Sequence, residues 1–592
     1  MKPASIALFG LFLLPVAAAP ALAQTPLEKE KSSWPQAAVR AEHGMVASDE
    51  PLASAAGVEI LRRGGNAVDA AVATAFALAV VEPAAGNIGG GGFMLVRLAD
   101  GKADFFDYRE TGPAKATPGM YVKPDGSQDE DAATLGYRAV AIPGTVAGLE
   151  MALKTHGTMK LAEVMAPAIR LASQGFPVSE KLGRGMAEES KGLERFPESR
   201  RIFLRNGNPY KPGEIFRQPE LAATLKRIAR KGAAEFYRGK TAKSLAREMA
   251  RSGGLITRAD LAGYKPKVRE VLRASYEQDG HTWEVLAPPP PSSGGVAVIE
   301  ALNMLQGVPL KGWEDAASVH KVVEAMRRVF ADRAAYLADP DFAAVPVAGL
   351  TSPCYARELA ATIDPLHASS SKTVHAGTPH VCGQAAAAAA PETITGLGEG
   401  QNTTHFSVVD AAGNAVASTF TLNDSYGSHV TSKAGFLLND EMSDFTTKPG
   451  EPNPLFGLIQ SAANAPGPGK RPLSSMTPTI LTRDGKLSFV TGSPGGPRII
   501  SATLLTILNW MRLGMEAQAA INAPRFHHQW MPDRVVLENS FPAAVEEALR
   551  GMGHETSRRG NIGLVNAIGI DARTGERLGA ADPRTNGSAQ GY

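Results

Sequence analysis

The stretch that decides the fold reads NTTHFSVVD and occupies residues 402–410. The residues of this stretch alternate between two faces, as in a β-strand that is packed in a core. The preceding residues 367–400 are rich in alanine, serine and glycine, which indicates a mobile connector. A flexible segment therefore meets a rigid strand at the bond between Asn402 and Thr403.

Cutting that bond would give Thr403 two chemical roles. Its hydroxyl is a nucleophile, and the new α-amine would have an unperturbed pKa of about 7.7 to 8.0, close to working pH. A threonine in such a place more often simply begins a strand. The rest of the chain has to decide between these two interpretations.

A β-hairpin is predicted from residues 403–410 and 415–422, which flank the turn-forming residues 411–414. If Asp410 faces Ala415, Thr421 falls opposite Thr404 and beside Thr403. Neighbouring strands lie only about 4.8 Å apart. The hydroxyl of Thr421 would then reach the hydroxyl or amine of Thr403.

A second hairpin is predicted at residues 479–491, followed by a glycine-rich turn at 492–498 and an apolar helix at 499–512. Unhindered N–H groups at a helix start can point at one spot and stabilise the oxyanion of an acyl transfer. An ordinary glycine-rich helix entry explains the same residues.

The first half of the chain predicts helices at residues 52–63 and, after a cap at Asn66 or Asp69, up to Val81. The second helix is apolar nearly all round and is expected inside the fold. Strands at 93–98 and 103–108 form a hairpin that ends at Arg109. Residues 145–363 are predicted to be mostly helical.

An export signal is predicted at residues 1–23, where Lys2 precedes an apolar run and Ala21-Leu22-Ala23 precedes Gln24. No later apolar stretch approaches the roughly 20 residues that a membrane span needs. The mature chain is therefore expected to be exported, periplasmic or secreted, and without a membrane span.

Composition excludes some partners and leaves one covalent question open. The chain has 61 basic and 59 acidic residues, a net charge of +2, which gives no field that favours nucleic acid or an anionic membrane. Cys354 and Cys382 have no metal-ligand spacing, and a disulfide between them is possible but cannot be deduced. His527 and His528 are adjacent and are expected to make structural contacts. No metal and no cofactor are predicted.

Nine motifs in chain order resemble those of the γ-glutamyltranspeptidase family and span nearly all of the chain after residue 23. They are GGNAVDAA (64–71), DYRE (107–110), PSSGG (291–295), NTTHFSVVD (402–410), TLN (421–423), NDEMSDF (439–445), RPLSSM (471–476), TGSPGGPR (491–498) and APRFHHQW (523–530).

The resemblance implies an α+β fold of the N-terminal-nucleophile hydrolase type, a four-layer αββα sandwich. It also implies a precursor that cuts itself between Asn402 and Thr403. The products would be a large subunit of residues 24–402 and a small catalytic subunit of residues 403–592. The two subunits would stay together as a heterodimer within one fold.

The resemblance further implies that Thr403 takes the γ-glutamyl group of glutathione or a related amide as an ester and passes it to water, an amino acid or a peptide. The roles it implies are as follows: Thr421 orients Thr403 and contacts substrate; Gly495 and Gly496 form the oxyanion hole, with Gly496 also at the substrate; Arg109, Ser474 and Ser475 bind the α-carboxylate; Asn423, Glu441 and Asp444 bind the α-ammonium.

Two other functions stay open at this point. A cephalosporin or glutaryl-amide acylase would share the nucleophile but would bind no α-ammonium. An inactive exported binding protein would keep the fold and stay uncut. Residues 449–460 resemble a lid loop of the family, with Phe456 where a tyrosine is common.

Overall fold

The computed structural model describes residues 33–383, 402–453 and 455–592. Residues 36–592 form one compact unit, which contains both sheets and the cavity between their strand ends. The expected export signal and residues 384–400 of the expected connector lie outside the described residues.

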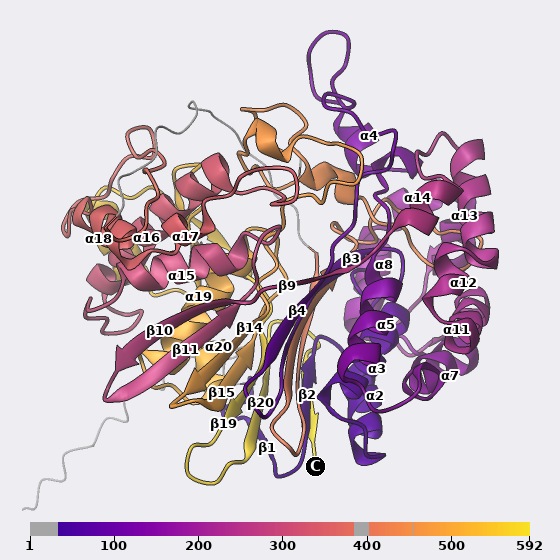
Figure 1. The fold of residues 1–592 in the computed structure, drawn as a ribbon, viewed down its shortest axis with the longest axis horizontal. Helices are drawn as coiled ribbons and strands as arrows, with labels where there is room; N and C mark the ends of the chain where they lie inside the picture. The colour runs from indigo at the N-terminus through magenta and orange to yellow at the C-terminus, as the bar shows by residue number, and fades with distance from the viewer. Residues whose placement is uncertain (1–32, 384–401, 454) are drawn as a thin grey trace, which may run out of the picture. The chain divides into compact units, whose positions relative to one another are not determined.

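Two antiparallel sheets of seven strands each form the centre of this unit (Figure 1). In order across the first sheet, the strands are β1 (Val39–Ala41), β20 (Arg577–Ala581), β19 (Asn566–Ile570), β15 (Lys486–Thr491), β14 (Thr479–Arg483), β11 (His281–Ala287) and β10 (Leu272–Gln278). Across the second sheet they are β21 (Ser588–Gly591), β2 (Met45–Ser48), β12 (Thr404–Val409), β13 (Ala415–Thr421), β3 (Gly91–Arg97), β4 (Ala103–Tyr108) and β9 (Lys267–Arg269).

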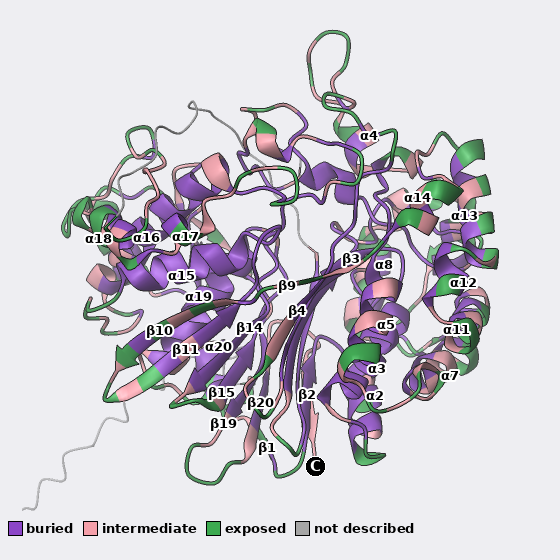
Figure 2. Ribbon diagram, in the orientation of Figure 1, coloured by how far each residue is buried: buried purple, intermediate pink, exposed green. Residues whose placement is uncertain are grey.

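Alternating side chains explain why the sheets pack on two sides. Along β3, Phe93 and Leu95 join the apolar cluster between the two sheets, whereas Met94 and Val96 join the cluster under the helices. Successive residues of a strand point to opposite faces, so an uninterrupted apolar strand can serve both layers. The central strands are accordingly buried along most of their length, whereas edge strands such as β9 and β10 are partly exposed (Figure 2).

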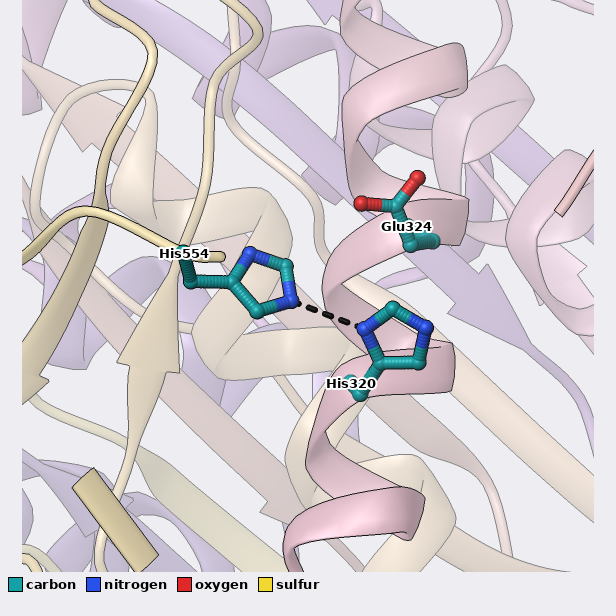
Figure 3. Close-up of side chains that lie close together, drawn as sticks. All are labelled: His320, Glu324 and His554. Carbon is teal, nitrogen blue, oxygen red and sulfur yellow. Dashed lines mark hydrogen bonds between the residues drawn. The ribbon is translucent and has the colours of Figure 1, made fainter. Parts of the chain in front are cut away.

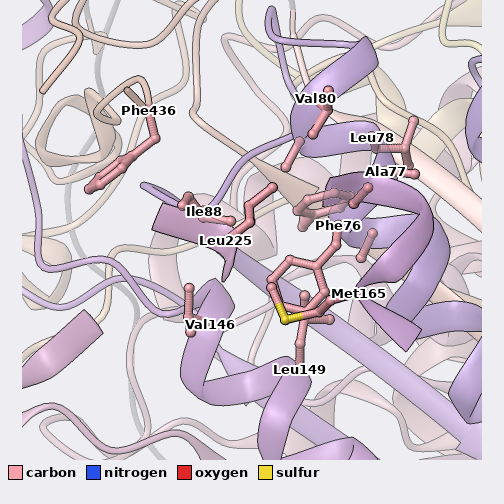
Figure 4. Packing of buried hydrophobic residues seen from close by; sticks show 14 of the residues in the cluster. Phe76, Ala77, Leu78, Val80, Ile88, Val146, Leu149, Met165, Leu225 and Phe436 are labelled. Atoms are coloured by element: carbon pink, nitrogen blue, oxygen red, sulfur yellow. The ribbon is translucent and has the colours of Figure 1, made fainter. Parts of the chain in front are cut away.

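The helices over the second sheet are organised around α3, whose fifteen residues are all buried. Asn66 accepts hydrogen bonds from Val68 and Asp69 N–H, and Asp69 accepts one from Asn66 N–H, a complete capping box. Figure 4 shows Phe76 and Leu78 of α3 in the apolar cluster of this layer. The helices of the layer are α2 (Pro51–Arg62), α3 (Ala67–Val81), α5 (Thr145–His156), α6 (Leu161–Val164), α7 (Ala166–Gln174), α8 (Glu180–Glu188), α9 (Ser190–Glu194), α10 (Pro197–Phe203), α11 (Pro219–Lys231), α12 (Ala233–Tyr237), α13 (Lys240–Arg251) and α14 (Arg258–Gly263).

A second helical layer covers the outer face of the first sheet. It consists of α15 (Gly294–Met304), α16 (Ala316–Tyr336), α17 (Val347–Leu350), α18 (Pro353–Ala361), α19 (Arg498–Met511), α20 (Ala517–Asn522) and α21 (Ala543–Gly551). The predicted αββα sandwich is thereby confirmed. No helix in the described part of the chain is both long enough and apolar enough to span a bilayer.

Short elements complete the unit. They are α4 (Glu130–Thr134), η1 (Tyr137–Ala139), η2 (Glu441–Asp444), η3 (Ala462–Asn464), β5 (Phe176–Pro177), β6 (Leu204–Arg205), β7 (Asn208–Pro209), β8 (Ile215–Phe216), β16 (Phe526–His527), β17 (Val535–Glu538) and β18 (Thr556–Arg559).

The prediction that residues 145–363 are mostly helical misses the strands β9, β10 and β11. Asp279 and Gly280 both have positive φ and turn the chain between β10 and β11. Residues with positive φ at both central positions are typical of a tight hairpin turn. The turn signal was therefore present in the sequence, among helices on both sides.

The predicted register of the β12–β13 hairpin is wrong by one residue. Val409, not Asp410, faces Ala415, so Thr404 faces Phe420. Asp410 belongs to the loop, where its carboxylate accepts hydrogen bonds from the N–H groups of Asn414 and Ala67. Continued by one position, the observed register brings Thr421 opposite Thr403 itself.

The described part of the expected connector, residues 367–383, is held by specific contacts rather than mobile. Ser371 is fully buried and bonds Arg327 and Asp533. Cys382 forms a disulfide with Cys354 of α18, with the two Cα atoms 5.4 Å apart. This covalent link fastens the segment to the helical layer of the first sheet.

Reducing the disulfide should destabilise the protein. A link across this sequence separation of 28 residues is expected to contribute about 3 kcal/mol to the free energy of unfolding. Urea unfolding with and without dithiothreitol measures the difference. The Cys354→Ser/Cys382→Ser variant is the control and should not respond to the reductant. Equal midpoints for the wild type in both conditions would contradict the expectation.

Candidate active site

A small cavity lined by buried residues lies where strand ends of the second sheet meet the turn before α19. Its lining residues are Arg109, Arg333, Thr403, Thr421, Asn423, Glu441, Asp444, Phe456, Leu458, Gln460, Leu473, Ser474, Ser475, Met476, Gly496, Pro497 and Ile499. Nine of the eleven predicted site residues are in this set. The two others, Asn402 and Gly495, are chain neighbours of Thr403 and Gly496.

Thr403 lies just before β12 and is buried, with its hydroxyl close to two oxygen atoms. Its Oγ1 is 3.2 Å from Oγ1 of Thr421 and within hydrogen-bonding distance of the carbonyl oxygen of Asn402. Thr421 Oγ1 in turn donates to that same carbonyl oxygen over 3.2 Å. The two threonine hydroxyls thus converge on the peptide bond between Asn402 and Thr403.

Arg109 follows β4 and forms buried ion pairs with Glu441 and Asp444. Its Nε donates to the carbonyl oxygen of Pro472 over 3.1 Å. The guanidinium therefore joins the end of β4, the 3₁₀ turn η2 and the loop of residues 471–476. Its planar donor fork suits two carboxylates at once.

Burial sets the electrostatics of this cluster. Burial alone would lower the pKa of Arg109, but the charges of Glu441 and Asp444 outweigh it and the pKa rises above its ordinary value. Burial raises the pKa of Glu441 well above its ordinary value, although Arg109 opposes the shift. Arg109 therefore stays charged, and its charge favours the ionised form of Glu441 against the effect of burial.

The polar residues predicted to bind substrate lie on turns around Arg109. Asn423 has a φ of +84° directly after β13, and its side-chain N–H donates to Ser443 Oγ over 2.8 Å. Ser474 accepts a hydrogen bond from Met476 N–H over 3.1 Å. The hydroxyl of Ser475 accepts one from Arg333 over 3.3 Å. Carboxylates and hydroxyls are thereby present on one cavity wall.

The turn before α19 requires glycine at two positions. Gly495 and Gly496 have φ values of +131° and +58°, conformations that other residues rarely adopt. A Cβ on Gly496 would lie 2.6 Å from the ring of Phe456. Phe456 is buried and covers this glycine, so the lid-like segment is packed on the cavity here.

His405 lies two residues after Thr403 but does not serve the cavity. Burial lowers its pKa to about 3, so the ring is neutral. Its nitrogens bond Thr419 Oγ1 at 2.7 Å and Ser407 Oγ at 3.2 Å. The ring is a structural group of the sheet.

Within the described part of the chain, His320, Glu324 and His554 form a cluster with the residue types of a metal site (Figure 3). The two imidazoles bond each other over 2.8 Å, and His320 Nε2 bonds the carbonyl oxygen of Asp364. Glu324 is ion-paired with Arg327 and Arg328. Two guanidinium groups beside the only carboxylate of the cluster oppose a divalent cation. The cluster is better explained as a hydrogen-bonded histidine pair.

The adjacent histidines of the motif APRFHHQW (523–530) make structural contacts, as predicted. His527 bonds Ser501 Oγ at 2.7 Å and Gln529 at 2.9 Å, and His528 Nδ1 accepts from Trp530 N–H. Both rings are fully buried.

Sequence reasoning missed Arg333, which lies in the last turns of α16 and lines the cavity. It belongs to none of the nine motifs. The only signal in the sequence was an arginine in a helix that has apolar residues at many of its buried positions. Such a pattern does not distinguish a cavity residue from an ion pair in a core.

Comparison with known proteins gives consistent matches along the chain. A family model described as gamma-glutamyltranspeptidase matches residues 53–592. The glutathione hydrolase proenzyme of Pseudomonas sp. (strain A14) is 46% identical over 571 residues, 94% of this chain and 96% of that protein. The glutathione hydrolase proenzyme of Escherichia coli (strain K12) is 43% identical over 551 residues, 92% of this chain and 91% of that protein.

Among solved structures, the cephalosporin acylase from Bacillus halodurans is similar throughout, with a TM-score of 0.81 at 27% sequence identity. The match covers 98% of this chain and 99% of that chain. The acylase shares the fold, and the two glutathione hydrolase proenzymes are considerably more similar in sequence.

Replacing Gly496 tests the packing over the cavity. We expect Gly496→Ala to lower the free energy of unfolding by at least about 2 kcal/mol, since positive φ costs about 1 kcal/mol and the clash with Phe456 adds to it. Gly485→Ala is the matched control, because Gly485 has a φ of +77° and no atom within 4 Å of the place that its Cβ would take. Adding Phe456→Ala should recover part of the loss. Equal losses at both glycines in urea unfolding would refute the clash.

Proposed function

Because the chain belongs to the γ-glutamyltranspeptidase family, we propose that it takes a γ-glutamyl group from glutathione or a related amide and passes it to water, an amino acid or a peptide. The observation that carries this proposal is the single cavity that contains the Thr403 hydroxyl, the Arg109 guanidinium and the carboxylates of Glu441 and Asp444. A nucleophile and both signs of charge lie within one small molecule's length of each other.

The first reaction is on the chain itself. The Thr403 hydroxyl attacks the carbonyl carbon of Asn402, the C–N bond breaks, and the nitrogen takes a proton to become the Thr403 α-amine. Water then hydrolyses the Asn402 ester and returns the hydroxyl. The donation from Thr421 to the Asn402 oxygen supports this step, because it would stabilise the negative charge that develops there.

The products would be residues 24–402 and 403–592, which stay associated as a heterodimer. The word proenzyme in the names of the two bacterial relatives supports such a cleavage. In later turnovers the free amine of Thr403 serves as the base for its own hydroxyl, and Thr421 orients that hydroxyl.

In each turnover Thr403 forms an ester with the γ-carbonyl, and the leaving amine takes the proton that the α-amine removed. Water or an acceptor amine then attacks the ester and receives the acyl group. Gly495 and Gly496 would donate their N–H groups to the oxyanion. Their positive φ angles and their place before α19 support this role, since a helix start favours negative charge.

Substrate binding is best described as an exchange of ion pairs. In the empty cavity Arg109 is ion-paired with Glu441 and Asp444, and a carboxylate oxygen of Glu110 lies 3.6 Å from its Nη1. A γ-glutamyl group has an α-carboxylate for Arg109, Ser474 and Ser475 and an α-ammonium for Asn423, Glu441 and Asp444. A ligand with both charges offers a carboxylate to the guanidinium and an ammonium to the acidic side chains, whereas a ligand with a carboxylate alone gives the acidic side chains no new partner.

This exchange argues against the acylase alternative. A glutaryl group has the carboxylate but no ammonium, so Glu441 and Asp444 would lose Arg109 and gain nothing. The alternative of an uncut binding protein predicts one intact band on a denaturing gel.

We also propose export through residues 1–23 to the periplasm or the medium. The disulfide between Cys354 and Cys382 supports this location, since such bonds persist in oxidising compartments.

The direct test is release of the chromophore from a γ-glutamyl anilide, with and without an acceptor dipeptide, by three proteins. The wild type should be active and run as two bands on a denaturing gel. Thr403→Ala should be inactive and run as one band, because it lacks the nucleophile for both reactions. Thr403→Ser keeps a hydroxyl and should retain both. A Thr403→Ala protein that is cut and active would refute the mechanism, and faster cleavage of a glutaryl anilide would favour the acylase.

Arg109→Lys should separate substrate binding from cleavage of the chain. Lysine keeps the charge but loses the planar fork, so we expect the KM for the γ-glutamyl anilide to rise at least about tenfold while the gel still shows two bands. The control is Arg525→Lys, which changes a fully buried arginine paired with Asp582 outside the cavity. Equal loss of cleavage and binding would contradict this division of roles.

A further inference from the structure

Arg333 is a buried cation that has no ion pair with any carboxylate in the described parts of the chain. Only 2% of the residue is exposed to solvent. Its Nε donates to Ser293 Oγ over 3.0 Å and its Nη2 to Ser475 Oγ over 3.3 Å. Its Nη1 is buried and has no hydrogen-bond partner among those residues.

Such an arrangement is costly unless a ligand relieves it. Burial lowers the pKa of Arg333 to about 10, with Asp444 only partly opposing the shift. The guanidinium is still charged at neutral pH, and Asp444 acts on it only from beyond ion-pair distance. A buried charge without an ion pair and a buried N–H without an acceptor both destabilise the folded chain, and a ligand that satisfies them removes that cost. Arg333 lines the cavity, so an anion bound there would lower this cost.

Two chains of hydrogen bonds connect Arg333 to the serines that face the substrate. The first is direct, from Nη2 to Ser475. The second passes through Ser293, whose hydroxyl and N–H each donate to the carbonyl oxygen of Ser474 over 2.7 Å. The neighbouring Ser292 also pairs with Ser474 as an isolated β-bridge. The motif PSSGG, which had no assigned role, thus holds the segment of Ser474 and Ser475.

Arg109 and Arg333 differ in what they can offer a substrate. Arg109 is already ion-paired with Glu441 and Asp444, so an incoming carboxylate must displace one of them. Arg333 has no anion to release. The positive charge that is available before any exchange is therefore on Arg333.

We infer that Arg333, acting through Ser293 and Ser475, is a positioning residue that makes the cavity select acyl groups with a free α-carboxylate. The inference rests on the proposed function, since it assigns a residue to the same substrate group. It assigns the carboxylate side of the cavity two guanidinium groups, one that binds by exchange and one that has no ion pair, holds the Ser475 hydroxyl directly and holds the Ser474 carbonyl through Ser293.

The experiment compares the inhibition of γ-glutamyl anilide hydrolysis by L-glutamate and by 4-aminobutyrate, which differ only in the α-carboxylate. The ratio of their inhibition constants measures selection for that group. In Arg333→Met we expect this ratio to fall at least about tenfold, and the KM for the anilide to rise more than kcat falls. Arg333→Lys keeps the charge and should recover part of the ratio. Ser293→Ala should shift the ratio in the same direction by a smaller factor.

Arg328→Met is the matched control, because Arg328 is buried in the same helix but is paired with Glu324 outside the cavity. It should leave the ratio unchanged. If Arg333→Met weakens both inhibitors equally, or lowers kcat alone, the residue is merely structural and the inference is wrong. If Arg333→Met does not fold, an unchanged ratio in both Arg333→Lys and Ser293→Ala overturns it. A wild type that does not hydrolyse the γ-glutamyl anilide would instead refute the proposed function.

Discussion

The buried ion pairs of Arg109 with Glu441 and Asp444 are the constraint on which the cavity depends. The paired residues are 332 and 335 positions apart in the chain, and their side chains are almost completely removed from water. Removing one partner of a buried pair costs about 3 to 5 kcal/mol. The end of β4, the turn η2 and the serine-containing loop are therefore held in one arrangement, and the nucleophile stands at its edge. If the chain is cut after Asn402, the two signs of charge come from different subunits.

The same ion pairs explain why the cavity is lined by charged and polar groups that a bound ligand can still stabilise. Arg109 has carboxylates within ion-pair distance, whereas Arg333 has none among the described residues. A zwitterionic ligand would exchange the partners of Arg109 and would bring a carboxylate toward Arg333. Preorganised charge of this kind binds strongly only when the ligand's own charges are opposite in sign to those of the cavity and lie at matching positions.

The family resemblance predicted the layers of the fold and most of the cavity residues, whereas periodic and local signals predicted individual strands, helices and turns. The alternation after Thr403, the all-apolar helix α3 and the glycine turn before α19 were recognised directly. Two of the failures involve contacts that a local pattern does not show. Asp410 lies in the loop after its strand, where its carboxylate accepts from the N–H of Ala67 in α3 as well as from that of Asn414. Arg333 has no local signature, since only the folded chain brings it to Ser475.

The strand order of the two sheets affects how the chain can refold before and after cleavage. The hairpin of β12 and β13 lies between β2 and β3, and in the other sheet β20, β19, β15 and β14 lie between β1 and β11. Strands from both sides of the proposed cleavage point are thus interleaved, and neither piece has a complete sheet without the other. Before cleavage, refolding is a search by one chain. After it, two partners must first meet, and each exposes unpaired strand edges that favour aggregation. A cleaved molecule that unfolds could no longer refold as the single chain from which it was made.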